Sequence, residues 1–269
     1  MRRVALAAVL AGVTGAGCSG EDADAPAAPV AATNTYLACC AREFLGADAP
    51  VVELSGGAMC PGHFAIRPGQ VRDLRRCRVL LRFGFQEDLD AKLQPVSENM
   101  RIVGVNIPGG LCEPESYLAA CRAAADALVE CGLVDRDRAE QTLGDIARRM
   151  GTLDAEARRR IRQASLQAAA VLASEHQASF CRRLGLEVAA TFPAVDRARP
   201  RQLDRARRAG RDAGAKLVVA NRPEGRRVAD KLADDLDVPT VVLDNFPRAG
   251  LTFDEMVRAN LAALVAACD

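Results

Sequence analysis

The sequence predicts an α/β protein with two lobes, each a parallel β-sheet covered by helices, joined by a long helical element. Short apolar runs rich in β-branched residues alternate with helical patterns along most of the chain. This alternation stops at an Arg-, Glu- and Ala-rich segment, residues 135–167, and resumes at residue 168. β-α-β alternation is typical of parallel sheets with helical crossovers, so the interruption divides the chain into lobes at 30–134 and 168–269.

The N-terminal residues 1–18 are predicted to be an export signal. Arg2 and Arg3 precede an apolar stretch, residues 4–13, that is too short to span a bilayer. The segment that ends at Cys18 resembles a bacterial lipobox, so we expect a lipid anchor on this cysteine; ordinary secretion with cleavage nearby is the alternative. Residues 19–29 are acidic and rich in Ala and Pro, which predicts a flexible tether. Both alternatives place the protein outside the cytoplasm, in the periplasm or at the cell surface.

The first lobe is predicted to contain four strands with helices between them. Pro68 and Pro114 suit the first turn of a helix, because this turn does not need the missing N–H. The expected strands are 30–32, 51–54, 79–83 and 101–105, and the expected helices are 35–45, 68–75, 87–93 and 114–131.

The second lobe repeats this pattern after one or two long helices in residues 135–167. The run 168–173 fits a strand or a helix, and we interpret it as a strand because a loop with candidate ligands follows. Gly185 is expected to end a helix over 177–184. The other expected strands are 186–191, 216–220 and 240–243, and a helix over 252–268 closes the chain.

Composition narrows the possible partners. The net charge of +1 gives no long-range attraction to nucleic acid, and no further stretch is apolar enough to cross a membrane. Ten cysteines are many for this length, and removing Cys18 leaves an odd number. We expect most of the cysteines outside the candidate site to be buried small side chains, with disulfides as the alternative.

Both histidines of the chain follow predicted strands. His63 lies in the loop Cys60-Pro61-Gly62-His63 after the second strand, and His176 lies three positions after the end of the run 168–173. Two more predicted strands end in residues of ligand type, Cys112 with Glu113 and Glu115 in one loop and Asp244 in the other. Ligands of parallel sheets bind beyond the carboxyl ends of the strands, so a metal held by these loops, two from each lobe, would bridge the lobes.

These loops resemble those of the metal-binding solute-binding proteins of bacterial ABC importers, the zinc and manganese class. The resemblance covers almost the whole chain after residue 30. His63 matches the first histidine loop of that class, and Cys112-Glu113-Pro114 matches a second ligand segment whose histidine is replaced. The segment 172–176 matches the third, and Asp244 at the end of Val241-Val242-Leu243 matches the acid of the fourth.

The resemblance implies two lobes joined by a long rigid helix, with the metal in the cleft between them. It also implies a binding protein that is not an enzyme, a membrane permease as its partner, and a monomer that binds no nucleic acid. The implied ligands are His63, Cys112, His176 and Asp244, with Glu113 or Glu115 in reserve for Cys112. Cys60 completes the predicted set, because it lies three positions before His63 and the Pro-Gly turn between them brings it within reach of the same ion. Thiolate and imidazole favour tetrahedral Zn²⁺ over Mn²⁺ or Fe²⁺. Cysteine ligands and the lack of a long His-rich loop indicate a divergent branch of that class.

Several alternatives remain open from the sequence. Cys60 and Cys112 can form a disulfide instead of binding metal. His176 can be a helix-start residue bonded to the backbone, and Asp244 can be an acid that only shapes a turn. Cys60 with His63 or His176 as its base is the arrangement of a thiol-dependent exported enzyme, and a protein of the same fold can bind a metal chelate.

Overall fold

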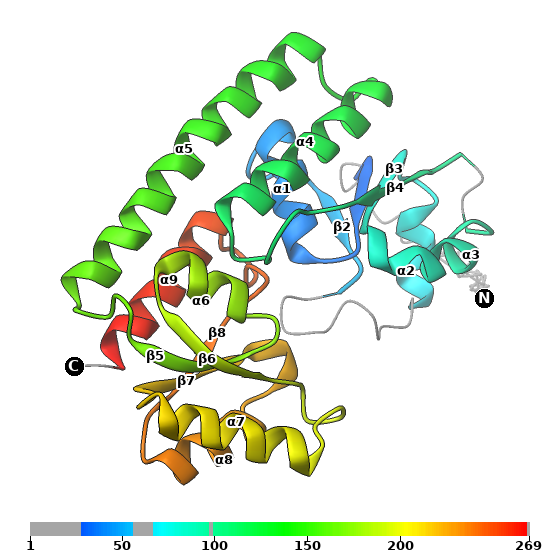
Figure 1. The fold of residues 1–269 in the computed structure, drawn as a ribbon. Helices are drawn as coiled ribbons and strands as arrows, with labels where there is room; N and C mark the ends of the chain where they lie inside the picture. The colour runs from blue at the N-terminus through cyan, green and yellow to red at the C-terminus, as the bar shows by residue number, and fades with distance from the viewer. Residues whose placement is uncertain (1–27, 56–66, 97–98, 268–269) are drawn as a thin grey trace, which may run out of the picture.

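The computed structural model describes residues 28–55, 67–96 and 99–267, which form two α/β lobes and a long helix beside them (Figure 1). Each lobe is built on a four-stranded sheet in which all strands are parallel. The order in the first sheet is β2-β1-β3-β4, with β1 Val30–Ala32, β2 Val51–Glu53, β3 Val79–Phe83 and β4 Arg101–Val105.

Both faces of the first sheet are buried, because alternate strand residues point to opposite faces. Val79 and Leu81 face α1 and α4, whereas Leu80, between them, packs with Leu74 and Leu93 on the other face. The helices of the first face are α1 Thr35–Leu45 and α4 Pro114–Glu130, and those of the second are α2 Pro68–Leu74, the 3₁₀ helix η1 Gly84–Leu89 and α3 Asp90–Leu93. The single helix expected over 87–93 is therefore wrong in type and start: it begins as a 3₁₀ turn at Gly84.

The second sheet has the same arrangement, with the order β6-β5-β7-β8. Val171 and Val219 face α6 and α9, whereas Leu172 and Val218 pack against α7 and α8. The strands are β5 Ala170–Ser174, β6 Glu187–Phe192, β7 Leu217–Asn221 and β8 Thr240–Leu243; the helices are α6 Ala178–Leu184, α7 Pro200–Asp212, η2 Arg222–Glu224, α8 Arg227–Leu236 and α9 Phe253–Ala266.

The run expected to be a strand over 168–173 does form one, which starts two residues later and ends one residue later than expected. Ala168 has a left-handed φ of 59°, which is incompatible with a strand, so β5 begins at Ala170. Gly185, with a φ of 91°, ends α6 as expected.

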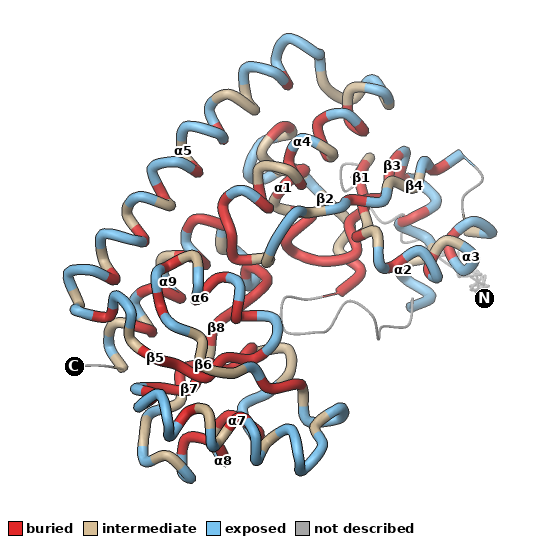
Figure 2. Tube along the Cα trace, viewed as in Figure 1, coloured by how far each residue is buried: buried red, intermediate tan, exposed pale blue. Residues whose placement is uncertain are grey.

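One long helix, α5 Arg136–Gln163, runs beside both lobes. It contacts α1 and α4 of the first lobe and α6 and α9 of the second. Its buried side chains recur every three or four residues, at Ile146, Met150, Leu153, Ala157 and Ile161, and so form a stripe along one face. Figure 2 shows buried positions recurring along α5 between exposed ones. These residues belong to a single hydrophobic core that includes residues of both sheets. The prediction of two parallel-sheet lobes joined by a long helix is confirmed.

No helix in the three described segments is long and apolar enough to cross a membrane.

Candidate functional site

The loops that follow β4 and β8 meet where the two lobes touch. Cys112, just before α4 of the first lobe, is 1% exposed. Its Sγ donates to the main-chain oxygen of Asp244 at 3.1 Å and to Asn245 Oδ1 at 3.4 Å, both in the second lobe. Burial raises the pKa of this thiol far above its ordinary value, although a hydrogen bond with Gln177 acts in the opposite direction. Cys112 is therefore a protonated thiol that links the lobes.

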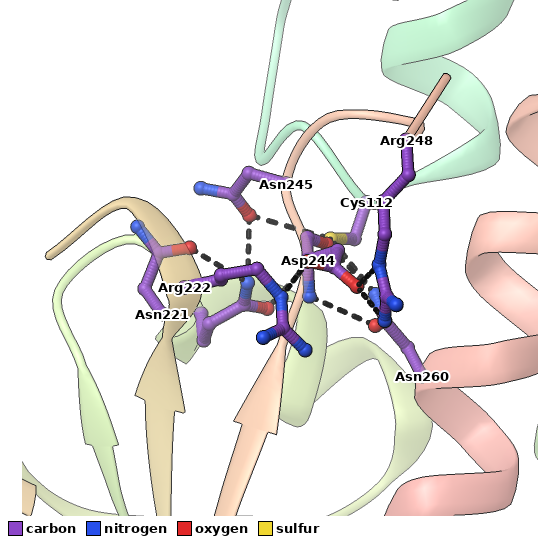
Figure 3. A network of polar contacts seen from close by, with 8 residues as sticks. Cys112, Asn221, Arg222, Asp244, Asn245, Arg248 and Asn260 are labelled. Atoms are coloured by element: carbon purple, nitrogen blue, oxygen red, sulfur yellow. Dashed lines mark hydrogen bonds and ion pairs between the residues drawn. The ribbon is translucent and has the colours of Figure 1, made fainter. Parts of the chain in front are cut away.

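The side chain of Asn260 in α9 makes two hydrogen bonds with the main chain of Asp244. Its Nδ2 donates to the Asp244 carbonyl at 2.8 Å, and its Oδ1 accepts from the Asp244 amide at 2.9 Å. The same Nδ2 lies 3.6 Å from Cys112 Sγ. One buried side chain thus satisfies both main-chain groups at the end of β8 and connects them to the thiol (Figure 3).

Buried amides complete the network. Gln177, at the N-terminus of α6, donates from Nε2 to Asn245 Oδ1 at 2.7 Å and to Asn221 Oδ1 at 3.3 Å. Its Oε1 lies 3.7 Å from Cys112 Sγ. The ends of β5, β7 and β8 and the loop after β4 therefore converge on one point, as expected for the carboxyl edge of a parallel sheet.

Two arginines bind the carboxylate of Asp244. Arg222 Nε donates to Oδ1, and Arg248 donates from Nε and Nη2 to Oδ2 at 3.0 and 2.8 Å. The Asp244 side chain is only 6% exposed, whereas the arginines are 38% and 56% exposed. Figure 3 shows both guanidinium groups beside the carboxylate. Both carboxylate oxygens are therefore engaged in charge-assisted hydrogen bonds.

His176 lies one position before Gln177 and has a different partner. Its Nε2 is 3.5 Å from Glu224 Oε1, and its side chain is 52% exposed. The carboxylate oxygens of Glu224 are buried without a hydrogen bond in the described structure, and Arg197 lies 3.8 Å from Oε1. In the segment between β5 and α6, the structure brings Gln177, not His176, to the thiol of Cys112.

The two reserve acids of the first lobe also have partners. The Glu113 carboxylate accepts from the Gly110 amide at 3.0 Å and from the hydroxyl of Ser179 in α6, so it too connects the lobes. Glu115 is exposed and lies 3.5 Å from Arg183.

Cys60 and His63 lie outside the described residues, so the structure does not test their predicted role as ligands or a Cys60–Cys112 disulfide. Within the described segments, no three His, Cys, Asp or Glu side chains are close enough together to hold a metal ion. The five-residue ligand set therefore stays a prediction. Of its three described members, Cys112 and Asp244 lie in one network, joined at the Asp244 main chain, and His176 is paired with Glu224.

Sequence reasoning missed the polar residues that make the network: Gln177, Arg222, Asn245, Arg248 and Asn260. Gln177 lies next to the predicted ligand His176, and Arg222 follows directly after strand β7. Asn260, 16 positions from Asp244, carries no local signal of its role.

Comparison with known proteins identifies the family. The model of the family described as zinc-uptake complex component A, periplasmic (ZnuA), matches residues 30–267. No curated protein matches the chain. A crystal structure of ZnuA has a TM-score of 0.73 at 15% identity, over 89% of this chain and 98% of that one. A zinc-bound deletion mutant of ZnuA has a TM-score of 0.72 at 16% identity, over 88% and 96%.

A third similar structure is that of the manganese-bound periplasmic metal-binding protein from Candidatus Liberibacter asiaticus. It has a TM-score of 0.72 at 10% identity and covers 89% of this chain and 99% of that one. At these identities the structures support the fold, and the family model supports the membership. The chain belongs to the periplasmic ZnuA family, the metal-binding solute-binding proteins of ABC importers.

Proposed function

We propose that this protein binds a zinc ion between its lobes and delivers it to the permease of an ABC importer. The proposed ligands are Cys60, His63, Cys112, His176 and Asp244. The observation that carries the proposal is the contact between Cys112 and Asp244, which joins the loop after β4 of one lobe to the end of β8 of the other. Membership in a solute-binding family favours transport over a thiol-dependent enzyme.

Zinc binding requires three local changes at these residues. Cys112 has to lose its proton, because zinc binds the thiolate. The Asp244 carboxylate has to exchange at least one arginine for the ion, since both of its oxygens are engaged. His176 has to turn from Glu224, or to keep that contact through Nε2 and bind through Nδ1.

The remaining features of the proposal follow from the sequence. Residues 1–18 direct export, Cys18 carries the lipid anchor, and residues 19–29 are the tether. The N-terminal lobe comprises residues 30–134, the linking element 135–167 and the second lobe 168–269, and the protein acts as a monomer. Zinc is favoured over manganese or iron because two cysteines and two histidines suit tetrahedral zinc.

Metal content tests the proposal directly. Full-length protein, dialysed against equal zinc and manganese, should retain about one zinc per chain. His63→Ala and Cys112→Ala should each lose most of it. Cys77→Ala is the matched control, because Cys77 is buried on the far face of the first sheet, and this variant should keep its zinc. Retention of manganese alone would contradict the choice of metal, and retention of neither would contradict metal binding.

The state of Cys112 separates metal binding from the disulfide alternative. We expect Cys112 to react with an alkylating reagent in denatured, unreduced protein, and zinc to protect it in folded protein. A Cys60–Cys112 cross-linked peptide would exclude both cysteines as ligands and leave His63, His176 and Asp244.

Binding of a metal chelate is a second candidate, favoured by the two partly exposed arginines. Arg222 and Arg248 carry two positive charges beside the single negative charge of Asp244. Guanidinium groups bind carboxylates well, so they can bind the carboxylates of a chelator. If a zinc chelate is the ligand, the protein should bind zinc citrate more tightly than zinc chloride. Arg248→Gln should then bind both zinc sources with the affinity that the wild type has for zinc chloride. Equal affinity for the two zinc sources would exclude the chelate.

A further inference from the structure

A pair of buried tyrosines fixes how α1 and α4 pack against each other. The rings of Tyr36 in α1 and Tyr117 in α4 are 5.5 Å apart and nearly perpendicular, at 87°. Both side chains are fully buried. Residues four positions apart lie on the same face of a helix. One turn beyond each tyrosine, α1 presents Cys40 and α4 presents Cys121, so the tyrosine contact brings the two cysteines opposite each other.

The two cysteines face this interface from opposite helices. Both residues are 0% exposed in the same hydrophobic core, and after burial itself the neighbouring Cys121 is what raises the pKa of Cys40 most. Their neighbours at the helix interface are small, with Ala41 on α1 and Ala120 and Ala124 on α4. Small residues allow helix backbones to approach closely, and a disulfide requires Cα atoms roughly 4.4–6.8 Å apart. The interface therefore has the side chains that a disulfide between helices needs.

We propose that Cys40 and Cys121 are a disulfide-forming pair that links α1 to α4 in the exported protein. In the structure both cysteines are thiols. Exported proteins meet oxidising conditions, in which neighbouring thiols are oxidised and disulfides persist. The pair goes beyond the proposed function, because neither cysteine belongs to the proposed zinc site.

The reaction is a thiol–disulfide exchange with a disulfide-bearing oxidant of the periplasm. The two S–H bonds break, one S–S bond forms between Cys40 and Cys121, and the two electrons and two protons reduce the oxidant to a dithiol. Burial raises the pKa of Cys40 well above its ordinary value, so the thiolate that attacks the oxidant is scarce in folded protein. Oxidation therefore belongs to folding after export, before α1 and α4 close over the pair.

Peptide mapping of the full-length protein after export tests the pair. Cells are quenched in acid, and the protein is denatured without reductant and alkylated. Digestion with trypsin and a Glu-specific protease separates Cys121 from Cys112, because Glu113 and Glu115 lie between them. The expected product is a cross-link between the peptide of Cys40 and that of Cys121, which disappears on reduction.

Cys39, the neighbour of Cys40, is the matched control. The cross-link should persist in Cys39→Ala and disappear in Cys40→Ala and Cys121→Ala. Alkylation of both Cys40 and Cys121 in exported wild-type protein would overturn the proposal, and so would a cross-link from Cys39. The wild-type map decides the matter even if a variant fails to fold.

Thermal unfolding gives a second, independent measurement. A disulfide across about 80 residues restricts the unfolded chain. Protein reduced while unfolded and then refolded should therefore melt on the order of 5–15 °C below oxidised protein. Cys121→Ala should show no such difference between oxidised and reduced samples. Equal melting temperatures for oxidised and reduced wild-type protein would count against a linked pair. Zinc content is measured on the same samples, so failure of this proposal is distinguishable from failure of the zinc site.

Discussion

Asp244 has two separable roles, one through its main chain and one through its carboxylate. The main-chain carbonyl and amide hold Cys112 and Asn260, whereas the carboxylate binds Arg222 and Arg248. A substitution that changes only the carboxylate should therefore leave the junction of the lobes in place.

Asp244→Asn tests the carboxylate alone. We expect the zinc affinity to fall at least tenfold, because a charged ligand is lost and two arginines remain unneutralised nearby. The melting temperature should change little, since the main-chain contacts stay. Competition titration with a zinc chelator measures the affinity. Arg211→Gln, on the outer helix α7, is the control and should bind zinc as the wild type does. Unchanged affinity in Asp244→Asn would remove Asp244 from the ligand set.

The candidate site could be predicted only in part. The sequence indicated the loops after β4 and β8, because a strand pattern followed by Cys112 or Asp244 is visible locally. The amides were not predictable, since Asn and Gln are common at turns and acquire this role only through partners far away in the sequence. Gln177 shows the limit: the neighbouring His176 has the stronger chemical signal, but the turn after β5 directs Gln177 toward Cys112.

Among the elements, α9 depends on a capping box at its start. Thr252 Oγ1 accepts from the Glu255 amide at 3.3 Å, and Glu255 accepts from the Thr252 amide at 2.8 Å. These bonds satisfy two of the main-chain donors that the first turn leaves free. They also lower the pKa of Glu255, first through the Thr252 amide and then through the Thr252 hydroxyl. The start of α9 should therefore be sensitive to acid.

Thr252→Ala should lower the melting temperature by about 2–4 °C at neutral pH. Because the folded pKa of Glu255 is lowered, its contribution is present above the unfolded pKa and is lost as the pH falls through the folded pKa. The difference between wild type and Glu255→Gln should accordingly shrink below about pH 4. Calorimetry across this range measures it. A difference that stays constant down to pH 2 would show that the carboxylate is not involved.

The helix α5 is the element that contacts both lobes, and Leu153 is its most buried large side chain near the middle. Leu153→Ala should cost about 2–5 kcal/mol of the free energy of unfolding, since it leaves a cavity in the common core. Thr152→Ala, on the exposed side of the same turn, should cost far less. Urea denaturation followed by circular dichroism compares the two variants. Similar losses would indicate that α5 does not stabilise the lobes through this stripe.

Most elements were predictable because their signals are local. The largely apolar runs 79–83, 101–105 and 240–243 indicated strands, and the prolines at the starts of α2 and α4 indicated helices, in the places where the structure has them. The error over 87–93 has a physical origin: Gln86 Oε1 accepts from the Phe83 amide at 2.9 Å and from Thr33 Oγ1 at 2.8 Å. This long-range pairing favours an early 3₁₀ turn, which no helical periodicity indicates.

At the scale of the whole molecule, one hydrophobic core passes through both lobes and α5, while each sheet has a separate core on its outer face. Polar contacts between the lobes include those of Cys112 with Asp244, Glu113 with Ser179 and Glu115 with Arg183. A ligand that binds to both lobes should therefore stabilise the protein as a single unit.

The melting temperature with and without zinc tests the central claim most directly. A ligand that binds only the folded state stabilises it by about 4 kcal/mol at a thousandfold excess over the Kd, which corresponds to a rise of roughly 8–16 °C for a protein of this size. We expect this rise for the full-length protein with zinc, a smaller one with manganese, and none for a variant carrying both His63→Ala and His176→Ala. A melting temperature that does not change at saturating zinc would contradict the account.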